Sequence, residues 1–132
     1  MTWLRVASVG AVALVLSSVS PAPADPIPDP KIHRQATLVT PGQILVLVDF
    51  ACQEGTDTGI FVGANQPIVG RPDTNGGGFA SLEATGTRQT AEVLVNAFGG
   101  VWTAGDASAN AQVSCGSGAF GRDSAEIVIE LR

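Results

Sequence analysis

The stretch QILVLVDFAC, residues 43–52, is the part of the sequence that decides the fold. Apolar residues recur at every second position in it, which is the period of an extended strand with one buried face. The side chains predicted to point toward the core together are Ile44, Val46, Val48, Phe50 and Cys52. Asp49 falls on the opposite face, as expected for a face that meets solvent, and the apolar Leu45 and Leu47 share that face with it.

Outward from this strand, the same alternation recurs in short segments that Gly, Pro, Asn and Asp interrupt. Further strands are predicted at residues 36–40, 59–63, 79–85, 90–98, 109–115 and 125–131, with an edge strand at 67–70. The stretch RPDTNGGG, residues 71–78, is predicted to be a loop because it combines turn-forming residue types. No segment shows a helical period over a dozen residues, so the sequence predicts an all-β chain.

The clearest hairpin has its turn at residues 86–87. Register in a hairpin is selected when apolar residues face apolar residues and polar residues face polar ones. The register that satisfies this condition places Leu82 opposite Ala91 and Ala80 opposite Val93. We therefore predict a continuous antiparallel ladder between these two strands.

The first 24 residues have the three parts of a cleavable export signal. A short positive start, MTWLR, precedes an uncharged apolar run at residues 6–16, and Ala22 and Ala24 stand at the spacing of a small-residue cleavage site. The apolar run is well short of the roughly 20 residues that a membrane-spanning helix needs. An uncleaved N-terminal anchor is the alternative. We expect a protein that is secreted or associated with the cell envelope, with no membrane span after signal cleavage.

Cleavage after Ala24 would leave about 108 residues, which is the size of one domain. Residues 25–34 are rich in proline and are predicted to be a flexible spacer, which leaves residues 35–132 for the folded domain. In an exported chain an isolated pair of cysteines most often forms a disulfide, here between Cys52 and Cys115. Free thiols and pairing between two chains are the alternatives. A crosslink over so long a loop stabilises a domain by roughly 4 kcal/mol.

Seven short strands, with cysteines in the second and the sixth, favour two antiparallel sheets joined through the core by one disulfide. The segment Val39-Thr-Pro-Gly-Gln43, the cysteine spacing and the alternating strand of Cys115 resemble bacterial immunoglobulin-like domains of small secreted proteins. This resemblance implies an immunoglobulin-like two-sheet antiparallel β-sandwich over residues 35–132. A more distant similarity is to the small acidic apoproteins that carry chromophores in secreted antibiotic complexes.

The charge of the chain argues against nucleic acid as a partner. Seven Lys and Arg residues stand against twelve Asp and Glu residues, for a formal net charge of −5 at pH 7. The basic residues are scattered singly, whereas binding of a phosphate backbone needs clustered Lys and Arg. The expected partner is a protein, a glycan or a small molecule of unknown identity, and the chain is expected to be a monomer.

The sequence offers little for catalysis or metal binding. His33 is the only histidine and falls in the predicted spacer, where nothing would hold it beside a nucleophile. Asp73-Thr74-Asn75-Gly76 begins like a calcium loop, but the positions of the later ligands hold Gly77 and Ala84. We therefore expect no enzymatic activity, no catalytic residue, no metal and no cofactor.

Two features suggest a contact surface. Trp102 follows Phe98-Gly-Gly-Val101 between two strands, where it either fills one end of the core or anchors a ligand. The predicted loop 71–78 could border a binding surface, because loops on a rigid scaffold commonly carry function. The residues predicted to contact a ligand or partner are Trp102, Phe98, Arg71, Asp73 and Asn75.

These observations favour a secreted, non-catalytic binding or structural module of the extracellular space or the cell envelope. Two alternatives follow from the size, the disulfide and the distant similarity. One is a small-ligand carrier of the chromophore-binding apoprotein type, and the other is an inhibitor of a secreted enzyme.

Overall fold

The computed structural model describes residues 27–132, which form eight β-strands. The predicted export signal, residues 1–24, lies outside the described residues. The strands are β1 (Lys31–Ile32), β2 (Gln35–Thr40), β3 (Gln43–Phe50), β4 (Asp57–Ile68), β5 (Arg71–Glu83), β6 (Gln89–Gly99), β7 (Gly105–Cys115) and β8 (Phe120–Leu131). The prediction of an all-β chain is confirmed in this part of the sequence.

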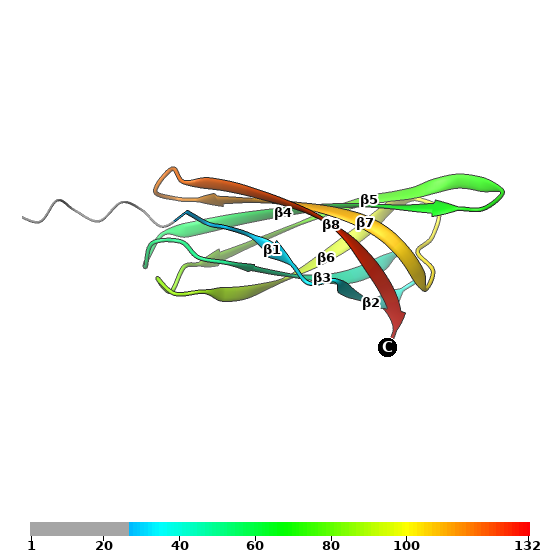
Figure 1. Cartoon of the computed structure of the whole chain (residues 1–132), viewed down its shortest axis with the longest axis horizontal. Helices are drawn as coiled ribbons and strands as arrows, with labels where there is room; N and C mark the ends of the chain where they lie inside the picture. Colours follow the sequence, from blue (N-terminus) through cyan, green and yellow to red (C-terminus); the bar gives the residue numbers. More distant parts are fainter. Residues whose placement is uncertain (1–26) are drawn as a thin grey trace, which may run out of the picture.

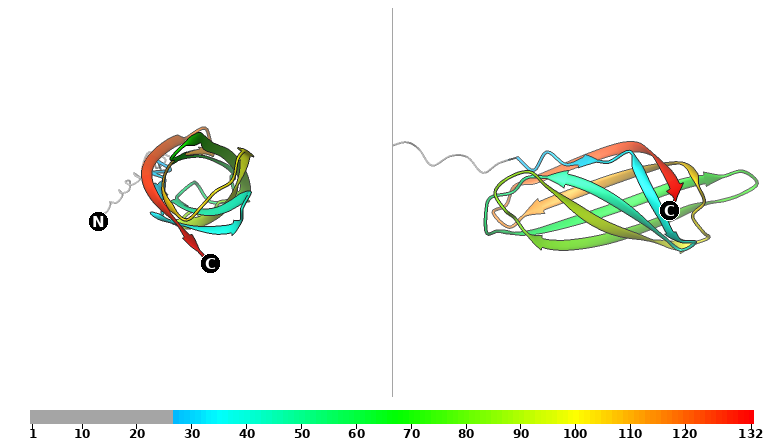
Figure 2. Two further views of the ribbon diagram at one scale, coloured as in Figure 1. Left: turned by 90° about the vertical axis from the view of Figure 1, so that its right-hand side faces the viewer. Right: turned by 90° about the horizontal axis from the view of Figure 1, so that it is seen from below.

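Seven of these strands close into a barrel. The order around the ring is β3-β2-β8-β7-β4-β5-β6, and β6 pairs again with β3. The short β1 is an extra strand beside β3. Figure 2 shows the ring in the view along the long axis, and Figure 1 shows the strands running side by side along that axis. The predicted immunoglobulin-like two-sheet sandwich is therefore wrong.

The pairing between β3 and β6 is what distinguishes the barrel from the sandwich. It is antiparallel and continuous from Gln43 opposite Asn96 to Phe50 opposite Gln89. A sandwich and a barrel share the same alternation of inward and outward residues, so the alternation alone does not separate them. The ring also contains one parallel pair, β2 with β8, where the prediction had only antiparallel neighbours.

The inward-facing residues of the strands fill the inside of the barrel and form the hydrophobic core. Ile44, Val46, Val48, Phe50 and Cys52 are fully buried, as the alternation of the strand predicts. Opposite them, β7 contributes small residues to the same core: Ala107, Ala109, Ala111 and Val113. A mixture of small and branched side chains suits the narrow interior of a small barrel, which is filled by side chains.

The predicted loop at residues 71–78 is a strand, and its glycines explain how it fits. A β-carbon placed on Gly78 would lie 1.9 Å from the carbonyl oxygen of Leu94, and one on Gly76 would lie 2.2 Å from that of Asn96. At these two positions β5 approaches the backbone of β6 so closely that only glycine fits. The turn of the β4–β5 hairpin lies instead at residues 69–70, where Gly70 has a φ of +77°.

The predicted β5–β6 hairpin has the right register but the wrong extent. Gly76 pairs with Ala97 and Gly77 pairs with Asn96, which is the register predicted from the apolar pattern. The predicted pairs closer to the turn do not form: there β6 pairs only with β3 and β5 only with β4. The two strands instead diverge toward the disulfide end of the barrel (Figure 1).

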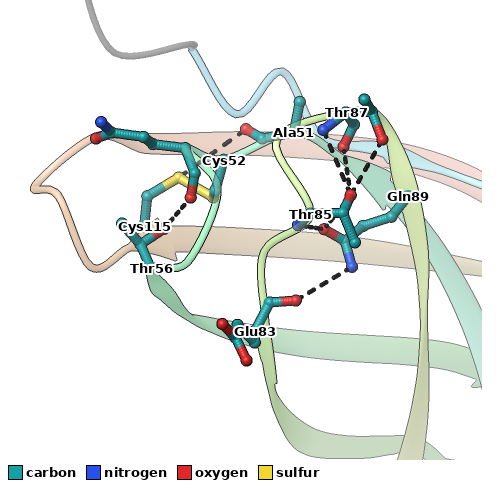
Figure 3. Close-up of a disulfide and its surroundings, with 9 residues drawn as sticks. Ala51, Cys52, Thr56, Glu83, Thr85, Thr87, Gln89 and Cys115 are labelled. Carbon is teal, nitrogen blue, oxygen red and sulfur yellow. Dashed lines mark hydrogen bonds between the residues drawn. A yellow bond between two sulfur atoms is a disulfide. The ribbon is translucent and has the colours of Figure 1, made fainter.

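A disulfide closes that end of the barrel. Cys52 follows β3 and Cys115 ends β7, and the two residues are bonded across 63 positions of sequence with a Cα–Cα distance of 5.6 Å. Figure 3 shows the bond beside Ala51, with the hydrogen-bonded turn around Thr85 nearby. The predicted disulfide is confirmed, although it joins two strands of one barrel rather than two sheets.

Residues 27–34 pack on the barrel, where the sequence predicted a flexible spacer. Ile32 is part of the buried core, and β1 pairs with β3. The carbonyl of Pro28 accepts a hydrogen bond from the amide of Ala51. The side chain of Asp123 accepts one from the amide of Ile32, and these backbone contacts tie the segment to the domain.

Candidate ligand-binding site

A cleft of about 560 Å³ opens at the end of the barrel opposite the disulfide. It lies between the β4–β5 hairpin and the β6–β7 connection, residues 100–104, and we call it the hairpin cleft. Ligand sites in proteins typically measure 300–1,000 Å³ and combine apolar walls with a few polar groups. The hairpin cleft has the size of such a site.

The floor of the hairpin cleft is held together by Thr74. This residue is buried, and its hydroxyl donates a hydrogen bond of 2.7 Å to the carbonyl of Val101. Gly100, next to it, has a φ of +79°, and a β-carbon there would lie 3.0 Å from the Thr74 hydroxyl. Few residues other than glycine adopt a positive φ. Glycine at position 100 therefore allows the β6–β7 connection to pack against β5.

A second clamp fixes the connection from the side of β4. The buried side chain of Gln66 accepts a hydrogen bond from the amide of Thr103 at 3.0 Å and donates one to the carbonyl of the same residue at 2.8 Å. A side-chain amide that bonds both the backbone N–H and the backbone C=O of one residue acts like the backbone of a neighbouring strand. The hairpin cleft is thus bordered by two segments that are hydrogen-bonded to each other, which favours a preformed shape.

The walls of the hairpin cleft are mainly apolar and open to solvent. Phe98 is 77% exposed and Val101 is 41% exposed, and Ile68 and Pro72 complete the apolar lining. Exposed large apolar side chains gathered around a hollow are uncommon on a surface that meets only water. Covering these side chains with an apolar molecule removes apolar surface from water, which contributes favourable binding free energy.

Three polar side chains border the same hollow. Arg71, Asp73 and Asn75 stand at every second position of β5 and therefore on one face of it. The side chain of Asn75 is hydrogen-bonded to that of Asn65 on β4, which orients its amide. The hairpin cleft thus offers one cation, one carboxylate and one amide to a ligand.

The residues that the sequence singled out lie mostly in this cleft. Phe98, Arg71, Asp73 and Asn75 line it, although they stand on two strands rather than on a loop. Trp102 does not line it. Its side chain is buried in the core, and its indole Nε1 has no hydrogen-bond partner within the described residues. The core alternative for Trp102 is the one that agrees with the structure.

His33 lies against Asp49 on the outer surface, away from the hairpin cleft. The distance from His33 Nε2 to Asp49 Oδ1 is 2.9 Å, and the hydroxyl of Thr90 donates to the same oxygen at 2.6 Å. Burial raises the pKa of Asp49, but the hydrogen bonds from Thr90 and His33 and the charges of His33 and Arg88 outweigh it, so the pKa lies below its ordinary value of 3.8. This contact joins residues far apart in the chain, so no local sequence pattern indicates it.

Sequence reasoning also missed a row of exposed aromatic side chains. Phe61, Phe79 and Phe120 point outward from three strands, and the first two are direct partners across β4 and β5. A signal was present in the alternation. Phe61 and Phe79 stand out of phase with the inward-facing positions of their own strands, so each had to lie on the solvent face.

Within residues 27–132, no group of three or more His, Cys, Asp or Glu side chains is arranged to hold a metal ion. No helix in the same part of the chain is long and apolar enough to cross a membrane.

Comparisons with known proteins do not show a family for this chain. No family model matches the sequence, and no curated protein matches it. Among solved structures, the chain is similar to the sporulation control protein Spo0M from Bacillus subtilis, with 12% sequence identity and a TM-score of 0.36. The match covers 80% of this chain and 49% of the other, so the chain spans about half the length of the Spo0M chain. A likeness at this level carries no argument about fold or function.

Proposed function

We propose that this protein is a non-catalytic binding protein, exported to the extracellular space or the cell envelope, that holds a small ligand in the hairpin cleft. The observation that carries the proposal is the cleft itself, about 560 Å³ in volume with Phe98 and Val101 exposed on its walls. The predicted export signal of residues 1–24 and the Cys52–Cys115 disulfide support this location, because disulfides form and persist in oxidising compartments outside the cytoplasm.

The chemistry of the lining indicates the kind of ligand. An apolar or aromatic body would cover Phe98 and Val101, while an anionic or hydrogen-bonding group would reach Arg71 or Asn75. The carboxylate of Asp73 beside Arg71 keeps the cleft from being strongly positive. A compact amphipathic molecule fits this combination better than a phosphate-rich one.

The experiment uses the fluorescent probe 1-anilinonaphthalene-8-sulfonate, which has an aromatic body and one sulfonate. The probe is titrated into the ¹⁵N-labelled protein, and amide chemical shifts are followed. We expect the largest shifts at Thr74, Gly100 and Val101, which border the hairpin cleft.

Two variants connect the binding to the site. Phe98→Ala removes an exposed ring of the lining and should weaken probe binding about fivefold or more, since truncation of an anchor typically costs more than 1 kcal/mol. Phe79→Ala removes another exposed ring, which lies outside the cleft, and should leave these shifts unchanged. The proposal would be refuted if the probe shifted no amide of the cleft, or if both variants bound it alike.

A second function is favoured by the tip of the β4–β5 hairpin. Val69 is fully exposed there, and the hairpin extends beyond the rest of the barrel in Figure 1. An inhibitor can present an exposed apolar residue on a projecting hairpin to the specificity pocket of an enzyme. The test is inhibition of a panel of secreted serine, cysteine and metallo-proteases. Inhibition that Val69→Asp abolishes would support it, and no inhibition of any enzyme in the panel would exclude it for these classes.

A further inference from the structure

A second hollow lies on the side of the barrel and shares no lining residue with the hairpin cleft. It is about 430 Å³ in volume and runs over β4 and β7. Phe61 and Phe79 stand on one side of it and Phe120 on the other, with Gly59 between them. We call it the phenylalanine groove.

The shape of the groove depends on the lack of a side chain at Gly59. A β-carbon there would lie 3.1 Å from Cζ of Phe79, so the ring of Phe79 leans over the glycine. The three rings remain 40%, 66% and 49% exposed for Phe61, Phe79 and Phe120. Four of the five phenylalanines of the chain are in fact exposed, and only Phe50 is in the core. A contiguous exposed apolar patch of this kind often marks a site of interaction with a partner or a ligand.

The polar residues of the groove are mostly uncharged. Gln112 and Ser114 point outward from β7 between the rings, and they offer an amide and a hydroxyl. Asp57 adds one carboxylate at the edge of the groove. The guanidinium of Arg122 lies 5.4 Å from the centre of the Phe120 ring, in the range of a cation–π contact.

The charges around the groove select against charged partners. An anionic ligand would meet the carboxylate of Asp57 and a chain whose net charge is −5. The guanidinium of Arg122 lies against the ring of Phe120. A cationic ligand would be opposed by the same Arg122. The lining is complementary to an uncharged ligand that has both apolar faces and many hydroxyl groups.

We propose that the phenylalanine groove binds an uncharged glycan chain. A pyranose ring has a face of C–H groups that packs on an aromatic ring, and a rim of hydroxyls that exchanges hydrogen bonds with amides and carboxylates. Phe79 and Phe120 provide such surfaces on the two sides of the groove, and Gln112, Ser114 and Asp57 provide the polar partners. The groove is open along the barrel surface, which suits a polymer rather than an enclosed small molecule.

The proposal is independent of the function assigned to the hairpin cleft, and the experiment keeps the two apart. The protein is run by native electrophoresis in gels that contain hydroxyethyl cellulose, laminarin, glycogen or glycol chitin, with a gel containing polygalacturonate as the anionic comparison. We expect retardation in at least one neutral gel and none in polygalacturonate. Phe79→Ala and Phe120→Ala should each weaken the retardation about fivefold or more.

Two control variants test whether the effect belongs to the groove. Leu94→Ala changes an exposed apolar residue on another part of the surface, and Phe98→Ala changes the hairpin cleft. Both should be retarded like the unchanged protein. Thermal unfolding of every variant shows whether the fold is retained, and the exposed rings should be removable without loss of the fold.

Three results would overturn the proposal. One is the absence of retardation in every neutral gel, and the second is retardation that Phe79→Ala and Phe120→Ala do not weaken. The third is a dimer in sedimentation velocity that both variants dissociate, because a second copy of the chain would then be the partner of the groove.

Discussion

Gly76 lies against the indole ring of Trp102, and a β-carbon on this glycine would be 2.6 Å from Cζ2 of the ring. The same atom would be 2.2 Å from the backbone oxygen of Asn96. The buried tryptophan therefore occupies the space that a side chain on β5 would take. This contact connects the core to the end of the barrel where the hairpin cleft opens.

Replacement of Gly76 by alanine should destabilise the protein strongly. The added methyl group has no room against Trp102 or against a backbone atom, and overpacking of a core typically costs 1–3 kcal/mol or more. Gly99→Ala is the matched control, because a β-carbon at Gly99 would meet nothing within 4 Å. Urea denaturation should show a lower midpoint for Gly76→Ala and a nearly unchanged one for Gly99→Ala. Equal midpoints would contradict the close approach.

Loss of the disulfide should lower the free energy of unfolding by about 4 kcal/mol, because it constrains a long loop in the unfolded chain. The double variant Cys52→Ala, Cys115→Ala removes the bond without leaving a free thiol. Thermal unfolding of this variant should resemble that of the unchanged protein in the presence of a reductant. A reductant that lowers the melting temperature of the double variant as well would indicate an effect unrelated to this bond.

Stability should depend on acid through Asp49. Its pKa is lowered in the folded protein, so it contributes stability that is present above the ordinary value of 3.8 and is lost as the pH falls through the lower folded value. Thr90→Val removes one hydrogen bond to this carboxylate and should cost about 1 kcal/mol near neutral pH. The difference between the variant and the unchanged protein should shrink at acid pH.

A double-mutant cycle tests this assignment. In a chain that carries Asp49→Asn, the carboxylate is absent and Thr90→Val should have a smaller effect that no longer varies with pH over the acid range. If Thr90→Val were equally destabilising in both backgrounds, the hydroxyl would act through some other partner.

Much of the local structure follows from the sequence, because the inward face of each strand is apolar. Ile44, Val46 and Val48 are buried as their spacing indicates, and the register of β5 with β6 follows from matching apolar positions. The closure of the barrel does not follow in this way. Closure depends on which strand lies beside Leu45 and Leu47 in space, which is β6. The outward position of these two side chains does not reveal that strand, because it is the same in a barrel and in a sandwich.

The glycine run at residues 76–78 is a strand whose sequence resembles that of a loop. Gly76 and Gly78 look like residues of a loop, but they are needed because two backbones approach each other there, a constraint that is invisible without the partner strand. The residues predicted for the site, including Arg71 and Phe98, nevertheless lie together. The glycine-rich stretch and the Phe98-Gly-Gly segment are neighbours across the β5–β6 pairing.

The pairing of β3 with β6 closes the ring and makes the chain a barrel rather than a sandwich. Nuclear Overhauser contacts between backbone protons of the ¹⁵N- and ¹³C-labelled protein test it most directly. The barrel predicts cross-strand contacts of Val46 with Val93 and of Val48 with Ala91. An open sandwich would lack these contacts and would show contacts of Ala80 with Val93 and of Leu82 with Ala91 in their place, and that result would contradict the fold described.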